Sequence, residues 1–248
     1  FGTFISQRTG FWVHKTSSLY VSLKSGCDSA VHKHADDTSL TLQFEGRDFF
    51  VDSGYHSYDY SDPRVAMLRT QRGHSGLFFA EIDDCLPGLL YNYRRRVHAG
   101  IAPRKSEEAA SVSSHYSVDC EHSAQRRIDV LSDSRIRITD SAHSPQGWRA
   151  VQRFIVPKEA EIEVQDDRIF ITTDELRLTM VLPYEHAAQV ICSEQDKPFR
   201  GWRSSRPLEL LPAQCLEILP LRSDTPWVMD ILLDRATSGE VERDLAVG

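Results

Sequence analysis

One hairpin decides the fold class: Ser39-Leu40-Thr41-Leu42-Gln43-Phe44 leads through Glu45-Gly46-Arg47 into Asp48-Phe49-Phe50-Val51-Asp52. Apolar and polar residues alternate in its first arm, which is the pattern of a strand with one buried face. The glycine-containing turn then returns the chain along that arm. This stretch therefore predicts a β-hairpin that packs one face on a core.

The same alternation recurs to the end of the chain. Further hairpins are predicted where Ser132-Asp133-Ser134 and Asp166-Asp167 separate alternating segments, and late strands at 176–182, 216–219 and 228–233. Regularly spaced hairpins favour an all-β fold, a large antiparallel β-sandwich with few or no helices. The stretch from Ile101 to Val118, rich in Ala, Ser, Glu and Lys, is predicted instead as a long loop or short helix. We expect residues 1–248 to form one domain.

Charge and composition exclude some functions. The chain has 29 Lys and Arg against 36 Asp and Glu, a net charge of −7. This balance argues against a general binder of nucleic acid or of anionic membranes, so any polyanion must be met locally. No apolar run is long enough to cross a bilayer. Five widely spaced cysteines without a Cys-x-x-Cys pair predict small buried side chains rather than a disulfide framework, and leave the cellular compartment open.

Two histidines just before the hairpin suggest chemistry. His32 and His34 lie two residues apart, so on an extended segment they share one face while Lys33 points the other way. His74 follows Gly73 in a segment that can return it to the same area. Any one of the ten histidines alone is more often a hydrogen-bonded residue than a ligand. The i, i+2 pair favours a functional reading for His32 and His34.

The position of Asp52 depends on the turn of the hairpin. A three-residue turn places Asp52 opposite Leu40, on the histidine side, whereas a two-residue turn places it on the other face. Sequence alone leaves both registers open. If Asp52 joins the histidines, two imidazoles and a carboxylate suit zinc, with water in the fourth position.

Nearby aromatic and basic residues are candidates for contact with a substrate. Tyr55 and Tyr58 are the nearest groups that could move a proton, although aromatic residues after a strand usually cover a core edge. Arg69 and Arg72 could hold carboxylates bidentately, and Arg94 lies in a run that mixes tyrosines with three arginines. Exposed arginines are more often simply solvated.

These segments resemble the C-terminal domain of the heparinase II/III-like polysaccharide lyases. The resemblance is dense over residues 17–79 and rests on Gly26, His32-x-His34-Ala35-Asp36, Ser39-Leu40-x-Leu42, Gly46-Arg47, Val51-Asp52-x-Gly54, Tyr58, Arg69 and His74. Later, Gly201-Trp202-Arg203-Ser204 is similar to that domain's Trp-containing segment. The middle and the end match only in strand pattern.

The resemblance implies roles for the histidine region. His32 matches the histidine that faces the substrate, and His34, Asp52 and His74 match positions that hold a structural zinc in some members. One departure concerns His74: members usually continue with Asn-Thr, whereas Ser75-Gly76 follow here.

The resemblance also implies an activity and partners. Members pair an N-terminal α/α toroid with a C-terminal β-sandwich and cleave uronic-acid polysaccharides, such as glycosaminoglycans or alginate, by β-elimination. The chain would be the sandwich detached from its toroid, acting with it on an acidic polysaccharide or oligosaccharide. Because a tyrosine and other polar residues of the toroid share the proton transfers, we expect weak or no lyase activity from the isolated chain.

Two other readings stay open. A cupin-type metal protein fits Gly26 and His32-x-His34, but Thr38 and Ser39 stand where its Glu is expected. A non-catalytic carbohydrate-binding or scaffolding sandwich, in which zinc only fixes loops and arginines bind an acidic glycan, fits nearly as well. A serine hydrolase is poorly supported because no Gly-x-Ser-x-Gly motif is present.

Overall fold

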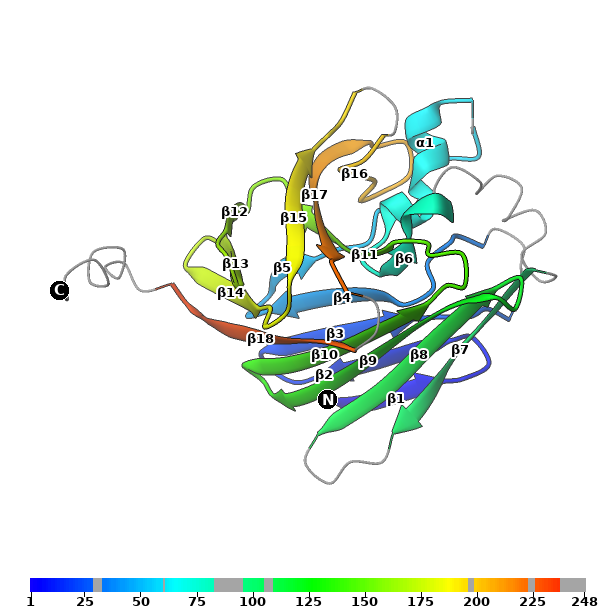
Figure 1. Ribbon diagram of the computed structural model, residues 1–248. Coiled ribbons are helices and arrows are strands. Elements are labelled where there is room, and N and C mark those ends of the chain that lie inside the picture. The colour runs from blue at the N-terminus through cyan, green and yellow to red at the C-terminus, as the bar shows by residue number, and fades with distance from the viewer. Residues whose placement is uncertain are drawn as a thin grey trace.

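The computed structural model describes residues 1–28, 33–59, 61–82, 96–104, 109–195, 199–222 and 226–236. Their strands form three sheets in which neighbouring strands run antiparallel (Figure 1). The first sheet has the order β1-β2-β3-β4-β5 and consists of β1 (Gly2–Ser6), β2 (Phe11–Lys15), β3 (Leu19–Lys24), β4 (Ser39–Phe44) and β5 (Arg47–Phe50). It carries the hairpin that the sequence predicts.

The other two sheets hold the later strands. The second has the order β12-β13-β14-β18-β10-β9-β8-β7: β7 (Val97–Arg104), β8 (Ala110–Val118), β9 (His122–Ser132), β10 (Arg135–His143), β12 (Glu161–Val164), β13 (Arg168–Thr173), β14 (Leu176–Val181) and β18 (Trp227–Arg235). The third has the order β15-β17-β11-β6, with β16 also paired to β17: β6 (Leu77–Phe79), β11 (Ala150–Pro157), β15 (His186–Cys192), β16 (Trp202–Arg203) and β17 (Leu211–Pro220). The predicted all-β antiparallel sandwich is confirmed.

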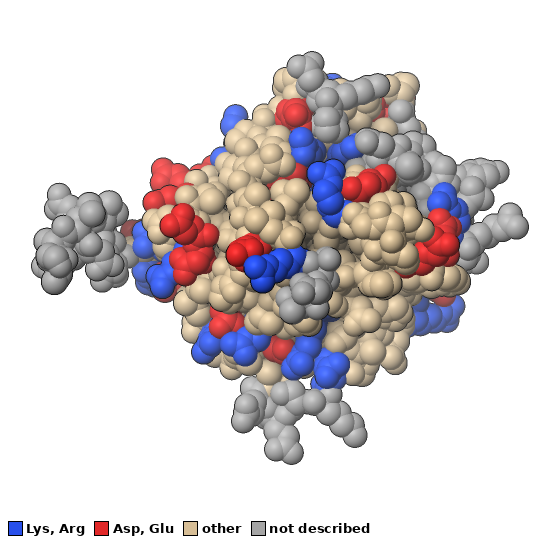
Figure 2. All heavy atoms as spheres, viewed as in Figure 1, with Lys and Arg blue, Asp and Glu red and all other residues tan. Residues whose placement is uncertain are grey.

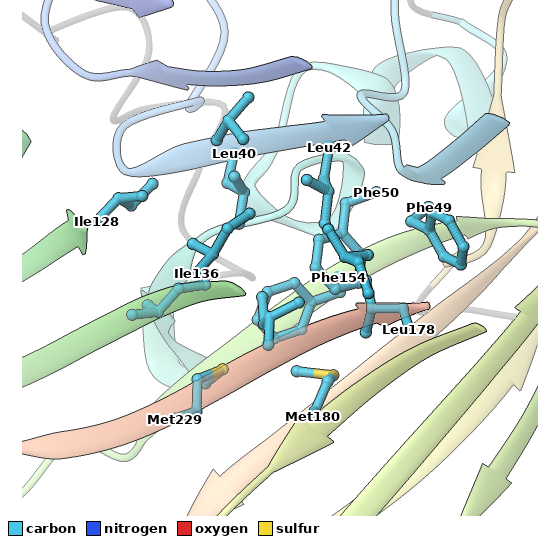
Figure 3. Packing of buried hydrophobic residues seen from close by; sticks show 14 of the residues in the cluster. Leu40, Leu42, Phe49, Phe50, Ile128, Ile136, Phe154, Leu178, Met180 and Met229 are labelled. Atoms are coloured by element: carbon cyan, nitrogen blue, oxygen red, sulfur yellow. The ribbon is translucent and has the colours of Figure 1, made fainter. Parts of the chain in front are cut away.

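The main hydrophobic core joins all three sheets (Figure 3). Leu42 of β4, Ile136 of β10, Phe154 of β11, Met180 of β14 and Met229 of β18 belong to one buried cluster. Leu42 and Ile136 each lie between polar neighbours, which is the period that predicted their strands. Burial of this apolar face is the dominant favourable term in forming the sandwich.

The β4–β5 hairpin combines the two registers that the sequence left open. Its turn contains two residues, because Phe44 pairs with Arg47 and Gln43 with Asp48. A β-bulge then shifts the register, so that Leu42 pairs with Phe50. Because of the extra residue, the pairing beyond the bulge is the one that a three-residue turn would give. Phe49 and Phe50 are both buried as a result.

The prediction of a loop or short helix from Ile101 to Val118 is wrong for most of the stretch, and residues 105–108 lie outside the described residues. This stretch contributes to β7 and β8, which pair with each other along their length, with Ile101 opposite Ser114. β7 is an edge strand, where exposed positions need no apolar side chains and Pro103 is tolerated. Pairing with β9 therefore outweighs the composition that suggested a loop.

The helices in the described part are short: α1 (Pro63–Leu68), η1 (Gln71–Gly73) and η2 (Ala80–Ile82). Asp62 caps α1, since its side chain accepts a hydrogen bond from the Arg64 N–H at 2.9 Å, and Pro63 occupies the first turn. Thr70 caps η1 by accepting the Arg72 N–H at 3.2 Å. These caps fix the path of the chain from the hairpin to His74.

The surface and the cysteines complete the description. Figure 2 shows Lys and Arg side chains interspersed with Asp and Glu over the face it presents. Among the described residues, no helix has the length and apolar character needed to span a membrane.

Cys27, Cys120, Cys192 and Cys215 are free thiols, and only Cys215 is fully buried. The expectation that most cysteines are buried is therefore wrong for the described four.

Candidate functional site

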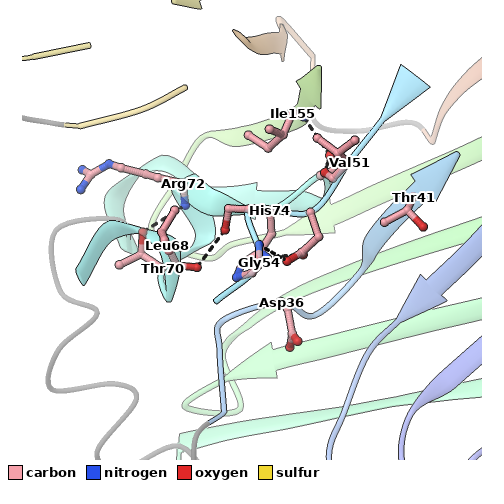
Figure 4. Close-up of polar contacts among 12 residues, drawn as sticks. Asp36, Thr41, Val51, Gly54, Leu68, Thr70, Arg72, His74 and Ile155 are labelled. Carbon is pink, nitrogen blue, oxygen red and sulfur yellow. Dashed lines mark hydrogen bonds and ion pairs between the residues drawn. The ribbon is translucent and has the colours of Figure 1, made fainter. Parts of the chain in front are cut away.

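The structure brings together His34, Asp52 and His74 from three separate segments. His74 Nδ1 donates a hydrogen bond to Asp52 Oδ2 at 2.6 Å, and the His34 and His74 ring centroids are 5.4 Å apart. His34 lies in the loop before β4, Asp52 just after β5, and His74 just after η1. We call these three residues the histidine centre. Figure 4 shows His74 beside Gly54 and Asp36.

The loop that carries His34 is not a strand. Residues 33–38 form an irregular segment, so the expectation of an extended strand is wrong for its described part. Lys33 is buried within this loop, where it forms ion pairs with Asp36 and with Asp37, the latter at 3.5 Å. Asp37 also accepts the Gly26 N–H at 2.6 Å. Local ion pairs, rather than sheet pairing, position His34.

Main-chain hydrogen bonds hold the three segments against each other. The Ala35 N–H donates to the Arg69 carbonyl at 2.8 Å, which ties the loop to the end of α1. The Ser53 N–H donates to the Gly73 carbonyl at 3.0 Å, next to the two residues of the Asp52–His74 bond. These bonds fix the centre independently of its own side chains.

Ser75 connects the centre to the third sheet. Its hydroxyl donates to the Val51 carbonyl at 2.9 Å and accepts the Ile155 N–H at 2.8 Å. Val51 and Ile155 also form a main-chain bridge, drawn as a dashed contact in Figure 4. The Ser75 hydroxyl therefore closes the junction between β11 and the residue that follows β5.

The late Trp-containing segment lies at the same site. The Ser204 N–H donates to the Ser53 carbonyl at 2.7 Å, and Gly54 and Ser204 form a parallel bridge. Trp202 is buried, with the Arg64 guanidinium 5.6 Å from its ring centroid. The two segments that carry the family resemblance, 150 residues apart in sequence, are therefore in direct contact.

Burial and charge give the two histidines different pKa values. Burial and, to a smaller extent, the charge of the neighbouring His74 lower the pKa of His34 to about 4, so His34 is neutral at pH 7. Burial opposes the charged form of His74 too, but the charge and hydrogen bond of Asp52 outweigh it and raise the His74 pKa. The same pairing lowers the pKa of Asp52 against the effect of its own burial.

The donor types of the centre fit zinc, but the arrangement is not a formed metal site. His74 Nε2 is buried and makes no hydrogen bond within the described residues. Such an orphaned imidazole nitrogen suits a metal ligand. However, the described part of the chain contains no group of three His, Cys, Asp or Glu side chains arranged to hold a metal ion. Asp52 and the Nδ1 of His74 are instead satisfied by each other.

Other predicted residues fall into two sets. His32 and Arg94 lie outside the described residues. Tyr55 and Tyr58 follow Asp52 in the chain and are 37% and 61% exposed, with ring centroids 5.1 Å apart, so they are accessible to a ligand. The roles predicted for these residues stay predictions.

The two described arginines of the predicted set flank the centre. Arg69 Nη2 donates to the Lys33 carbonyl at 3.2 Å, so part of its guanidinium holds the His34 loop. Arg72 is half-buried in η1 and its side chain extends away from His74 in Figure 4. Arg69 therefore lies beside the centre, whereas the Arg72 guanidinium points away from it.

Sequence reasoning missed Arg126, which is fully buried behind the centre. Its Nε and Nη2 donate to the two carboxylate oxygens of Asp140 at 2.9 and 2.7 Å, and its Nη1 lies 3.3 Å from the carbonyl oxygens of Thr38 and Ser75. Gln152 also donates to Asp140, at 2.9 Å. The available signal was its place on the apolar face of β9, between Ala124 and Ile128.

Comparison with known proteins gives the family. No curated protein sequence matches the chain. The chain is similar in structure to a heparinase III described as the BT4657 gene product, with a TM-score of 0.76 and 12% identity over 96% of this chain and 37% of that one. A mutant of heparan sulfate lyase HepC from Pedobacter heparinus gives a TM-score of 0.76 and 12% identity over 95% of this chain and 37% of that one.

These likenesses establish a shared fold, and the chain spans about 37% of the length of those solved structures. The sequence gives the more specific assignment. The family described as "Heparinase II/III-like, C-terminal" matches residues 7–205 and so includes both segments at the histidine centre. This match favours the heparinase-like reading over the cupin one. The chain belongs to the heparinase II/III-like C-terminal domain family.

Proposed function

We propose that this chain is the β-sandwich part of a polysaccharide lyase that cleaves uronic-acid-containing glycans by β-elimination. The observation that carries the proposal is the histidine centre, where His34, Asp52 and His74 meet inside the segment that matches the family. The remaining length of the parent protein would include an N-terminal α/α toroid. The names of the similar structures make heparan sulfate the first glycan to test.

The proposed reaction needs two proton transfers. A base removes the proton on the carbon beside the uronate carboxylate, the bond from the neighbouring carbon to the glycosidic oxygen breaks, and that oxygen receives a proton. The electron pair of the broken C–H bond forms the new C=C bond. We propose that His32 acts on the substrate, with Tyr55 and Tyr58 as proton donors or acceptors. The exposure of both tyrosines supports this assignment.

Recognition of the uronate requires positive charge at one place. Because the net charge is −7 and basic and acidic side chains are mixed on the face that Figure 2 shows, an acidic glycan must be held locally. Arg69 and Arg72 beside the centre are proposed to neutralise the carboxylate, together with Arg94. Positive charge at the carboxylate stabilises the negative charge that develops there during proton removal.

We also propose that His34, Asp52 and His74 hold a structural zinc ion. Support comes from the donor types and from the orphaned His74 Nε2. A bound zinc would supply a permanent positive charge and fix the three segments to each other. The neutral state of His34 at pH 7 leaves its nitrogen lone pair available for such a role.

The test is a lyase assay on the parent protein. Heparan sulfate and alginate are supplied separately, and the unsaturated uronate product is followed by its ultraviolet absorbance. We expect His32→Ala to abolish turnover while glycan binding is retained, and His98→Ala, on exposed edge strand β7, to leave turnover unchanged. Unchanged turnover in His32→Ala would indicate the alternative function, a non-catalytic carbohydrate-binding module. Robust turnover by the 248-residue chain alone would place the base within this chain.

A further inference from the structure

A cavity of about 290 Å³ lies away from the histidine centre. It opens where η2, the end of β8, the start of β9 and the loop before β11 meet. Ile82, Val118, His122 and Trp148 form its apolar wall. None of these residues belongs to the proposed lyase machinery.

The wall of the cavity is a rigid aromatic stack. The His122 and Trp148 rings are nearly parallel, with centroids 3.4 Å apart and an interplanar angle of 4°. The Phe79 ring meets both edge-on, at 5.9 and 6.0 Å. Contacts on several sides fix the orientation of the stack before any ligand binds.

His122 places a polar atom on this wall without a protein partner. The residue is only 3% exposed, and within the described part its single side-chain hydrogen bond joins Nδ1 to Ser144 Oγ at 2.9 Å. Ser144 Oγ already accepts the Trp148 N–H at 2.9 Å, so its own proton is available for Nδ1. In the tautomer in which the Ser144 hydroxyl donates to Nδ1, the ring proton of His122 lies on Nε2, and Nε2 offers a hydrogen-bond donor to a ligand.

The described residues of the rim are polar and carry net negative charge. Arg96 donates two hydrogen bonds to the Asp119 carboxylate, one of them from Nε to Oδ1 at 2.8 Å. Gln146 donates to Glu121 at 2.7 Å. These residues supply one guanidinium and two carboxylates, and their net negative charge would repel an anionic ligand.

We propose that this cavity binds one neutral sugar ring. The C–H face of a pyranose would pack on the apolar wall, one hydroxyl or ring oxygen would accept the His122 Nε2–H, and other hydroxyls would bond to the rim. The volume lies at the lower end of the range for ligand pockets, which fits a single ring. The proposal is independent of the lyase function, because the two sites share no residue.

The test is saturation-transfer NMR on the 248-residue chain with three methyl glycosides: β-glucoside, N-acetyl-β-glucosaminide and β-glucuronide. We expect saturation transfer to at least one neutral glycoside and weaker binding of the glucuronide. His122→Phe keeps an aromatic ring and removes the Nε2–H, so binding should weaken roughly tenfold, as for one lost hydrogen bond. Phe4→Ala, an exposed residue of β1, is the matched control and should bind as the wild type does.

Glu121→Gln keeps the proposal testable if His122→Phe does not fold. Glu121 is exposed, and its replacement removes one rim charge without a change in shape. It should strengthen binding of the glucuronide relative to binding of the neutral glycosides. The proposal is overturned if neither neutral glycoside binds, if the glucuronide binds more tightly than both, or if folded His122→Phe binds as the wild type does.

Discussion

The guanidinium Nη1 of Arg126 lies 3.3 Å from the main-chain oxygen of Ser75, the residue that follows His74. The same nitrogen is equally close to the carbonyl of Thr38, at the end of the loop that carries His34. One buried side chain thus contacts both segments that bring histidines to the centre. Its charge is balanced by Asp140 in the interior of the eight-stranded sheet.

Replacement of Arg126 by Met should destabilise the protein strongly. The change leaves the Asp140 carboxylate buried without its cation, and breaking a buried pair costs about 3–5 kcal/mol of unfolding free energy. Urea denaturation followed by circular dichroism measures this loss. Arg137→Ala is the control, because its pair with Asp230 is partly exposed and should contribute about 1 kcal/mol or less. Equal losses in the two variants would contradict the account.

Comparison of Gly54→Ala with Gly46→Ala should separate the cost of backbone strain from the cost of steric contact at the site. Gly54 has φ of +69°, and an added Cβ would lie 2.3 Å from the Ser204 carbonyl oxygen. Gly46 has a similar φ of +77° with open space around it. We expect Gly46→Ala to cost about 1–2 kcal/mol from the backbone alone, and Gly54→Ala to cost about 1–3 kcal/mol more from overpacking.

Thermal unfolding of both glycine variants checks this prediction. A larger drop in Tm is expected for Gly54→Ala than for Gly46→Ala. Equal drops would show that the contact between Gly54 and Ser204 does not constrain the loop after Asp52.

Much of the fold could be predicted from residue alternation, because each strand has one buried face. Leu40 and Leu42 identified the first hairpin, and 162–171 identified a later one. The bulge beside Phe49 could not be predicted, since either turn length satisfies the local pattern. β7 was missed because an edge strand with exposed positions carries no clear period.

The candidate site was predicted less completely. The spacing of His34, Asp52 and His74, with the family resemblance, anticipated that they would lie together. Arg126 was missed because an arginine in an alternating strand normally marks the solvent face. Its partner Asp140 lies directly opposite it in the β9–β10 hairpin, so the register of that predicted hairpin was the signal that could have paired them.

Glu217 should make stability depend on pH in acid. Burial opposes its charged form, but Arg153 and Arg200 outweigh that effect and lower its pKa below the ordinary value near 4.5. The unfolded chain therefore binds more protons than the folded one, and stability falls as pH drops from about 4.5 through the depressed pKa. Glu217→Gln should cost on the order of 3 kcal/mol at pH 7, and this deficit should shrink in that acid range.

Denaturation of Glu217→Gln and the wild type between pH 7 and about pH 3.5 measures that difference, across the ordinary range of carboxyl titration. Glu163→Gln, at an exposed position of β12, controls for the loss of one negative charge and should follow the wild type. A deficit of Glu217→Gln that stays constant with pH would contradict the assignment.

Zinc content is the most direct measurement of the proposed histidine centre. The chain is purified in the presence of zinc at neutral pH, dialysed, and analysed by mass spectrometry of the bound metal. We expect one zinc per chain in the wild type and in His98→Ala, and loss of the metal in folded His34→Ala. Zinc-free wild type, or full zinc content in His34→Ala, would contradict the proposal that His34, Asp52 and His74 form a metal centre.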